Sequence, residues 1–307
     1  MARYPFPQDP QLTAIAIAYQ NAAMIADMVL PRVPVGTREF RWLEYNKEDG
    51  FTLPETTVGR KSRPNQVEFG ASEKSGAVDD YGLDDAIPQD DIANAPQGYD
   101  PRGRAVEGLT NLILLDREVR VANKVFDAAT YPTGSKESLA SGDRFSVDTG
   151  KPISVISSAL DTPIMRPNVM VVGQTAWTAL RQHPEIVKAA HRNAGDSGMA
   201  EREAVAALFE LDEVIVGRGW VNTARRGQAP NFQRVWGNHI ALLHRDRTAD
   251  TQRGATFGYT AQFGDRVAGS WQDRNIGLRG GEMVRAGESV VEIVSAGDLG
   301  YFIENAA

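Results

Sequence analysis

The stretch Pro167–Val187, PNVMVVGQTAWTALRQHPEIV, predicts a strand followed by a turn and a helix. Residues 169–172 form an apolar run that is too short for a typical helix, and Gly173 closes it. Thr175 is a suitable N-cap for the helix that follows. Trp177 is the first of several apolar residues at helical spacing, so we expect it to anchor the core.

Many nucleotide-binding domains begin with such a strand, turn and helix. Phosphate binding at the turn needs several glycines, which let backbone N–H groups approach the phosphates closely. Here a single glycine is followed by Gln174, Thr175 and Ala176, and both the GxGxxG pattern and the P-loop lysine are absent. We therefore expect a packing unit that binds no nucleotide or other cofactor.

Composition and charge limit the class of protein. The 307 residues are 42% hydrophobic and 24% charged, which suits about two folded domains. The lack of cysteine excludes disulfides and thiolate metal sites. No apolar run approaches the ~20 residues of a membrane span, and no signal peptide is recognisable. A cytosolic protein, or one released without secretion, is therefore expected.

The net charge of −7 argues against a protein that grips DNA through a basic stripe. The basic residues are mostly arginine, which suits fixed ion pairs at protein interfaces better than lysine does. The charge pattern therefore favours protein partners.

The first 84 residues contain little that forms a core of its own. Residues 1–37 hold one amphipathic helical patch between prolines and read as an arm. Next, REFRWLEY places Phe40 and Trp42 on one face of a strand, and QVEFGASEKSGAV resumes a loose alternation after a long polar segment. A two-stranded hairpin is marginal alone in water, so this one must lie on another part of the chain or on a neighbour.

The acidic stretch 79–96, DDYGLDDAIPQDDIANAP, contains three Asp pairs. A calcium loop of the EF-hand type needs acids at alternate positions, then Gly, then a Glu at the twelfth position, and that spacing is absent. We expect a solvated acidic turn region here and no metal ion.

The longest helical pattern runs over residues 104–130 and predicts a helix of roughly 40 Å at 1.5 Å per residue. Its predicted apolar stripe comprises Val106, Leu109, Leu112, Ile113, Leu115, Val119, Ala122, Phe126 and Ala129. After a Ser/Gly-rich loop, helices and strands alternate from about residue 152, which predicts a compact α/β or α+β unit. The tail from residue 270 supplies further strands.

No constellation of catalytic residues emerges. His239 and His244 are predicted on opposite faces of a strand and make a poor metal pair, whereas His183 before Pro184 suits a capping role. The GDSG of residues 195–198 matches the turn around a serine-protease nucleophile, but His191 is too close in sequence to Ser197 for a triad built from separate elements. We expect no catalytic, cofactor-binding or metal-binding residues.

The order of the parts resembles the major capsid proteins of tailed bacteriophages, which have the Hong Kong 97 fold. The resemblance covers nearly the whole chain. It is carried by VLPRVPV after the arm helix, LDREVRVANKVF in the long helix and the opening stretch, and then by LFELDEVIVGRGWVNTA, VWGNHIALL and the ending DLGYFIENAA.

The resemblance implies an α+β fold with an N-terminal arm (1–37), an extended β-hairpin loop (38–84), a peripheral domain with a long spine helix (85–152), an axial domain (153–267) and returning strands of the peripheral domain (268–307). It also implies a structural protein without a catalytic site.

The same resemblance implies assembly. Copies of the chain would form pentamers and hexamers of an icosahedral shell around phage double-stranded DNA, without sequence-specific DNA binding and without a membrane. Portal, scaffold and decoration proteins are further implied partners, and the implied location is the virion, after assembly in the host cytoplasm.

Some members of the family are cross-linked between Lys and Asn. Lys61 and Lys74 lie in the predicted hairpin, but no acceptor is visible. Two other functions stay open: the shell protein of an encapsulin-type nanocompartment, and a small-molecule-binding enzyme built on residues 153–267.

Overall fold

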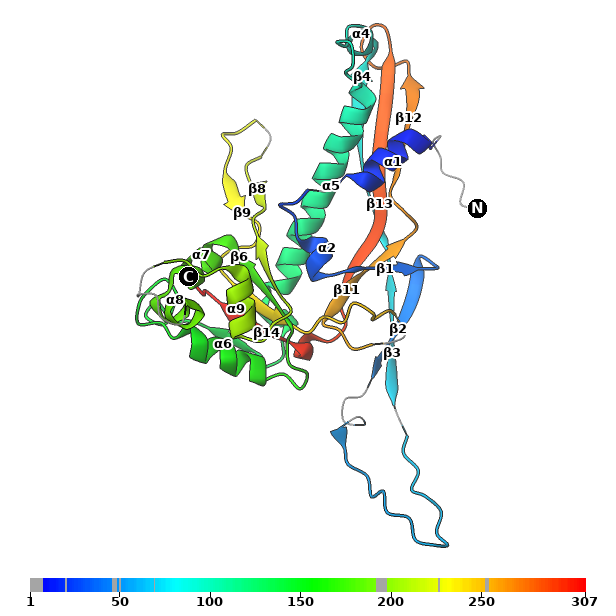
Figure 1. Ribbon diagram of the computed structural model, residues 1–307. Helices are drawn as coiled ribbons and strands as arrows, with labels where there is room; N and C mark the ends of the chain where they lie inside the picture. Colours follow the sequence, from blue (N-terminus) through cyan, green and yellow to red (C-terminus); the bar gives the residue numbers. More distant parts are fainter. Residues whose placement is uncertain are drawn as a thin grey trace.

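The computed structural model describes residues 8–19, 21–45, 49, 51–68, 70–191, 198–225, 227–251 and 254–307. Figure 1 shows an elongated molecule: a long helix and a long strand run side by side toward one end, a rounded α/β unit lies beside them, and a thin loop extends from the other end. The described helices are α1 (Pro10–Ala18), α2 (Ala26–Val29), α4 (Gln89–Ala93), α5 (Pro101–Val125), α6 (Pro152–Asp161), α7 (Gln174–Gln182), α8 (Pro184–His191) and α9 (Arg202–Leu208).

The long helix is α5, which we call the spine. Asp100 caps its first turn and Pro101 occupies the first helical position, where a missing N–H costs nothing. It covers most of the helix predicted over residues 104–130, but it begins earlier, at Pro101, and ends earlier, at Val125. Leu112 was expected on the apolar stripe, but its side chain is 52% exposed.

The described residues form two five-stranded sheets. The spine lies against the one with the longer strands, which we call the larger sheet. This sheet has the order β1-β11-β13-β12, and β4 pairs with the other edge of β13. Its strands are β1 (Arg32–Val35), β4 (Asp79–Pro88), β11 (Gly258–Phe263), β12 (Val267–Asp273) and the 14-residue β13 (Gly281–Val294).

The prediction of an acidic turn region over residues 79–96 is therefore wrong in its first half, because Asp79–Pro88 form strand β4. The strand runs antiparallel to β13, from the pair Asp79–Val290 to the pair Pro88–Gly281. An edge strand exposes most of its side chains, so aspartates are tolerated there and discourage pairing with other strand edges.

The second sheet forms the centre of the rounded unit and has the order β5-β14-β10-β6-β7. Its strands are β5 (Lys136–Ser138), β6 (Val169–Gly173), β7 (Glu213–Gly217), β10 (Ile240–Leu243) and β14 (Gly300–Glu304). Because β14 is apolar and buried between β5 and β10, residues 268–307 contribute to both sheets. They were expected to return wholly to the peripheral domain. Likewise β11, from the segment expected to be axial, lies in the larger sheet.

Two hairpins stand outside these sheets. One pairs β2 (Glu39–Tyr45) with β3 (Ala71–Ala77), which confirms the predicted extended hairpin. The other pairs β8 (Trp220–Asn222) with β9 (Phe232–Arg234). Figure 1 shows both hairpins projecting away from the body of the molecule.

The opening stretch forms β6 and α7, as predicted. The helix begins after Gly173, and no side chain caps it, so the expected Thr175 cap is wrong. Gly173 is required because a Cβ there would lie 2.0 Å from the carbonyl oxygen of Trp236. Trp177 is 2% exposed and lies in the core between α7 and the second sheet, as expected.

Replacing Trp177 with alanine tests this core. We expect Trp177→Ala to lower the free energy of unfolding by ~3–5 kcal/mol, the usual cost of removing a large buried aromatic side chain. Denaturant unfolding measures the change. Trp220→Ala is the matched control, because the Trp220 side chain is 51% exposed. Equal losses in the two variants would contradict the assigned core.

Candidate assembly surfaces

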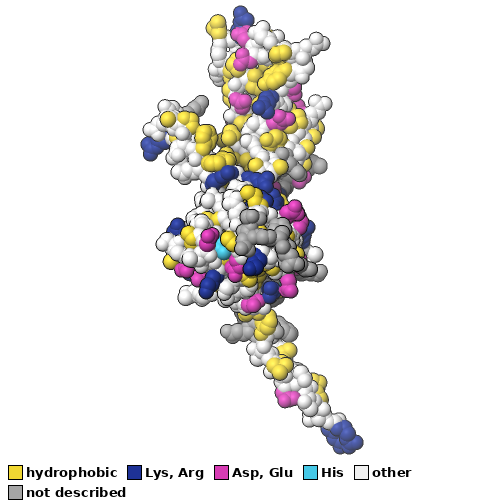
Figure 2. Space-filling view, turned by 60° about the vertical axis from the view of Figure 1, so that its left-hand side comes forward, with side chains coloured by type: hydrophobic (Ala, Val, Ile, Leu, Met, Phe, Trp, Pro, Cys, Tyr) yellow, Lys and Arg dark blue, Asp and Glu magenta, His cyan; other side chains and the backbone are white. Residues whose placement is uncertain are grey.

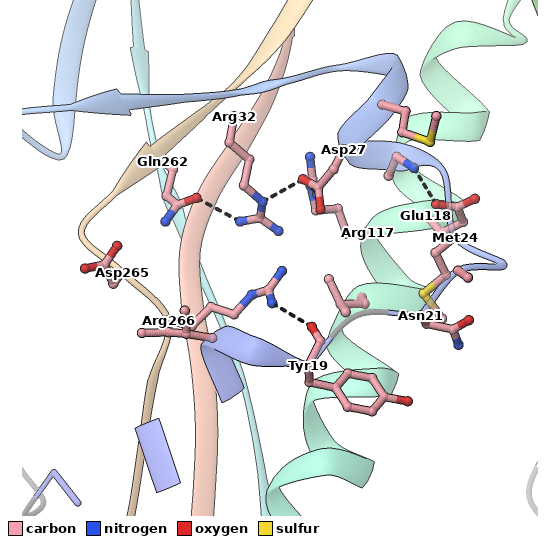
Figure 3. Close-up of a pocket in the computed structure, with 15 residues that line it drawn as sticks. Tyr19, Asn21, Met24, Asp27, Arg32, Arg117, Glu118, Gln262, Asp265 and Arg266 are labelled. Carbon is pink, nitrogen blue, oxygen red and sulfur yellow. Dashed lines mark hydrogen bonds and ion pairs between the residues drawn. The ribbon is translucent and has the colours of Figure 1, made fainter. Parts of the chain in front are cut away.

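A cluster of charged side chains lies where the N-terminal segment, the spine and the larger sheet meet. It borders a cleft of about 760 Å³ between the residues before β1, the spine and the β11–β12 turn. Figure 3 shows Asp27, Arg32, Arg117, Glu118 and Arg266 around this cleft. The cluster decides how the N-terminal segment is attached to the rest of the chain.

Arg117 is at the centre of the cluster, and its side chain is 1% exposed. It donates to the carboxylate of Asp27 beside β1 and, at 2.9 Å, to the hydroxyl of Thr260 in β11. It also donates to the carbonyl of Leu30 at 3.3 Å, and its Nε lies 3.8 Å from Glu292 Oε1. One guanidinium group therefore joins the spine to α2, β11 and β13.

Two further arginines surround the buried carboxylate of Glu288. Arg32 Nη1 lies 2.8 Å and Arg266 Nε 3.1 Å from Glu288 Oε2, and Arg32 Nε lies 2.6 Å from Asp27 Oδ1. Burial by itself raises the pKa of Glu288, but the guanidinium charge of Arg32, assisted by Arg266 and Arg117, outweighs burial and lowers the pKa. The pKa of Asp27 is lowered in the same way, against burial, by Arg117 and Arg32.

Glu118, next to Arg117 on the spine, makes a second link. Its carboxylate accepts hydrogen bonds from the backbone N–H groups of Ile25 at 2.9 Å and Ala26 at 2.7 Å, and from the indole N–H of Trp236. These bonds satisfy donors at the start of α2 that the helix cannot satisfy itself. Burial raises the pKa of Glu118 in spite of them.

Sequence reasoning missed both buried charges, although a signal was present. The buried face of the spine includes Ile113, Leu114, Val121 and Ala122, and positions 117 and 118 fall between them at helical spacing. A charged pair at core positions of a helix predicts buried partners, and here the partners come from far along the chain.

In the part of the extended hairpin that the structure describes, the buried aromatic anchor lies near the base. Phe40 is 8% exposed and packs with Val78 and Tyr259, and its ring lies 5.8 Å from that of Trp42. Beyond the paired strands, Phe51 is 67% and Leu53 91% exposed. Phe69, also expected on the hairpin, lies outside the described residues.

The far end of this loop is positively charged. Arg60, Lys61 and Arg63 are exposed, and Figure 2 shows basic side chains gathered at the end of the loop. Nothing else in the described chain surrounds them there, so the end of the loop is open to contact by another molecule.

Two of the aspartates of strand β4 are paired within the chain. Asp80 pairs with Arg38 and accepts from Ser289, and Asp84 receives two hydrogen bonds of 2.6 Å from Arg285. Asp79 and Asp85 are exposed and make no ion pair within the described residues.

Three histidines, His183, His239 and His244, make hydrogen bonds to the backbone. His183 Nδ1 accepts from the backbone N–H of Glu185 at 3.2 Å, which confirms its capping role. His239 Nδ1 accepts from the N–H of Asn305, and His244 Nδ1 lies 3.1 Å from the carbonyl of Arg166. Residues 195–197 of the GDSG stretch lie outside the described residues, so the protease interpretation is not tested there.

Over the residues that the structure describes, no group of three His, Cys, Asp or Glu side chains is placed to hold a metal ion. In the same residues, no helix has the length and apolar character needed to cross a membrane.

Similar proteins identify the class. No protein-family model matches the chain. A phage-related protein of Bordetella bronchiseptica has a TM-score of 0.76 at 21% identity, over 99% of both chains. The capsid of cyanophage P-SCSP1u has a TM-score of 0.61 at 11% identity, over 94% of this chain and 89% of the other. The spine, the large sheet, the projecting hairpin and the rounded α/β unit are thus those of a Hong Kong 97-like capsid fold.

Sequence identity then gives the family. The chain is 53% identical to the major capsid protein of Pseudomonas phage JBD67, over 100% of this chain and 99% of that protein. It is 27% identical to the major capsid protein of Burkholderia phage BcepMu, over 96% and 95% of the two chains. The chain belongs to the phage major capsid proteins.

The charged cluster predicts a pH-dependent stability. Because the pKa values of Asp27 and Glu288 are lowered in the fold, their contribution is complete above the pKa of about 4 that carboxyls have when unfolded, and it is lost as the pH falls. Glu118 has a raised pKa and acts in the opposite sense: its contribution is lost as the pH rises through its folded-state pKa.

We expect Glu288→Gln to lower the free energy of unfolding at pH 7 by ~3–5 kcal/mol, because it removes one partner from a buried ion pair. The variant should also lose less stability than the wild type on acidification from about pH 5 to pH 3. Urea titrations across this range measure both effects. Glu107→Gln, whose partner Arg104 is exposed, is the control; a parallel acid response in all three proteins would contradict the role of Glu288.

Proposed function

We propose that the chain self-assembles into a closed icosahedral shell of pentamers and hexamers around phage double-stranded DNA. The observation that carries this proposal is the hairpin of β2 and β3, whose distal loop is exposed and, over residues 51–68, contains no buried side chain. Ordering a chain costs on the order of 1–2 kcal/mol per residue for the backbone alone, so such a loop needs a partner surface. The named relatives are capsid proteins, so we take the partner surface to be a second copy of the chain.

The parts of the chain then have assembly roles. Residues 1–37 act as the N-terminal arm, 38–84 as the extended loop, 85–152 with 268–307 as the peripheral part, and 153–267 as the axial domain at the five-fold and six-fold vertices. The role of the arm is supported by the ion pair between its Asp27 and Arg117 of the spine, and that of the loop by its exposed Phe51 and its exposed cationic residues.

The role is structural, as it is for the named relatives. A net charge of −7 suits the wall of a DNA container, because a basic wall would retain DNA by counterion release. We place the protein in the virion after assembly in the host cytoplasm. A portal, a scaffold and decoration proteins are proposed partners.

Assembly is tested by light scattering and electron microscopy of the purified chain, with scaffold supplied if it is needed. We expect closed shells built of many copies. A dimer or tetramer under every condition would contradict the proposal, and shells that enclose a cargo protein in place of DNA would favour a nanocompartment.

The extended loop gives a second test, by limited trypsin digestion. Cleavage after Arg60 and Lys61 should be fast in free subunits and slow in shells, because a neighbour would cover the loop. Arg63 precedes Pro64 and is a poor trypsin site. A variant with Arg60→Gln and Lys61→Gln identifies the fragments, and equal cleavage rates in both states would show that the loop is not an assembly contact.

A further inference from the structure

The second hairpin, β8–β9, presents one exposed face. Trp220 lies opposite Arg234 and Asn222 opposite Phe232, so these four side chains point to the same side. Trp220 is 51% and Phe232 63% exposed, and the guanidinium carbon of Arg234 lies 4.0 Å from the centre of the Trp220 ring. We call Trp220, Phe232 and Arg234 the aromatic hairpin face.

This face is presented by an ordered backbone. Val235 N–H donates to Gly219 O at 3.0 Å, Arg234 Nη1 to Arg218 O at 2.9 Å, and Thr223 N–H to Asn231 O at 2.9 Å. Figure 1 shows the hairpin standing clear of the second sheet, and Figure 2 shows hydrophobic and basic side chains on the same projection. A rigid projection that holds large aromatic side chains in water is typical of a contact surface.

The charge of the hairpin selects the partner. Residues 218–234 contain four arginines and no acidic residue, in a chain whose net charge is −7. The hairpin therefore complements a surface that combines acids with exposed apolar side chains.

The chain carries such a surface along strand β4 and the spine. Asp79, Leu83 and Asp85 share one face of strand β4 with Tyr81, and Leu83 is 40% exposed. The guanidinium of Arg120 lies 3.7 Å from the Tyr81 ring centre and pairs with Asp116 of the spine. 

Leu112, 52% exposed, lies one turn before Asp116 on the same helix face. Because the spine packs against β4, we treat the exposed residues of the two elements as one area, which we call the acidic leucine surface: Asp79, Leu83, Asp85, Leu112 and Asp116.

We propose that the aromatic hairpin face of one copy docks on the acidic leucine surface of a second copy. The aromatic rings cover the leucines, while the arginines of the hairpin lie among the aspartates. The two surfaces differ, so the contact is head-to-tail and generates rings, as capsomers require. The inference rests on the proposed function, because it names a contact within that assembly.

The lack of cysteine in the chain permits a clean cross-linking test. Phe232→Cys protein is mixed before assembly with Leu83→Cys or with Leu112→Cys protein, and the shells are oxidised mildly. A disulfide requires Cα atoms about 4.4–6.8 Å apart, so the two cysteines will react only when the hairpin of one copy is docked on the other copy. We expect disulfide-linked dimers of the two variants on a non-reducing gel. Leu278→Cys, at a position 99% exposed, is the matched control partner and should give none.

A second variant separates docking from folding. Trp220→Ala combined with Phe232→Ala should keep the thermal unfolding of the wild type, because both side chains are exposed, and should lose assembly into rings and shells. Normal assembly of this variant would overturn the inference.

The remaining outcomes are also decisive. Shells without dimers at either leucine position overturn the docking inference and leave the capsid proposal standing. If the wild type does not self-associate, both fall together. A last outcome concerns nucleic acid. If short duplex DNA protects the cysteine of Phe232→Cys from alkylation, and neither Leu83→Cys nor Leu112→Cys forms a disulfide with it, the aromatic hairpin face binds nucleic acid and the inference is overturned.

Discussion

Two adjacent charges on the buried face of the spine, Arg117 and Glu118, hold the parts of this molecule together. Burying a charge is costly unless partners at hydrogen-bonding distance compensate, so each group fixes the position of whatever it binds. Arg117 binds Asp27, Thr260 and the carbonyl of Leu30. Glu118 binds the start of α2 and, through Trp236, the side of the second sheet. The arm, the larger sheet and the rounded unit are thereby joined at one turn of one helix.

This joint permits an elongated molecule without a single large core. Among the residues that the structure describes, the buried apolar side chains form four separate clusters: two flank the second sheet, one lies under the upper spine, and a small one lies at the base of the extended hairpin. Both hairpins project beyond these clusters, and a two-stranded hairpin buries little apolar area of its own. In the shell proposed above, neighbouring copies supply the partner surface for both hairpins, which accounts for the elongated shape.

Charge is divided unevenly over the surface. Aspartates line the edge strand β4, where they oppose uncontrolled pairing of strand edges, while the ends of both hairpins are basic. Exposed ion pairs contribute only ~0–1 kcal/mol each, so these charges select partners and orientation more than they add stability. In the contacts proposed above, the strength comes from the apolar and aromatic area that they bury.

The sequence by itself determined the elements whose signals are local. The apolar spacing of residues 104–130 predicted the spine, found at Pro101–Val125, and the spacing after Gly173 predicted the burial of Trp177. The order of such elements was enough to indicate the capsid family. The tertiary structure decided the rest: that the acidic stretch beginning at Asp79 forms a strand, and that β14 leaves β13 for the second sheet. Both depend on pairing with strands far along the chain, and a partner's free edge leaves no trace in the local sequence.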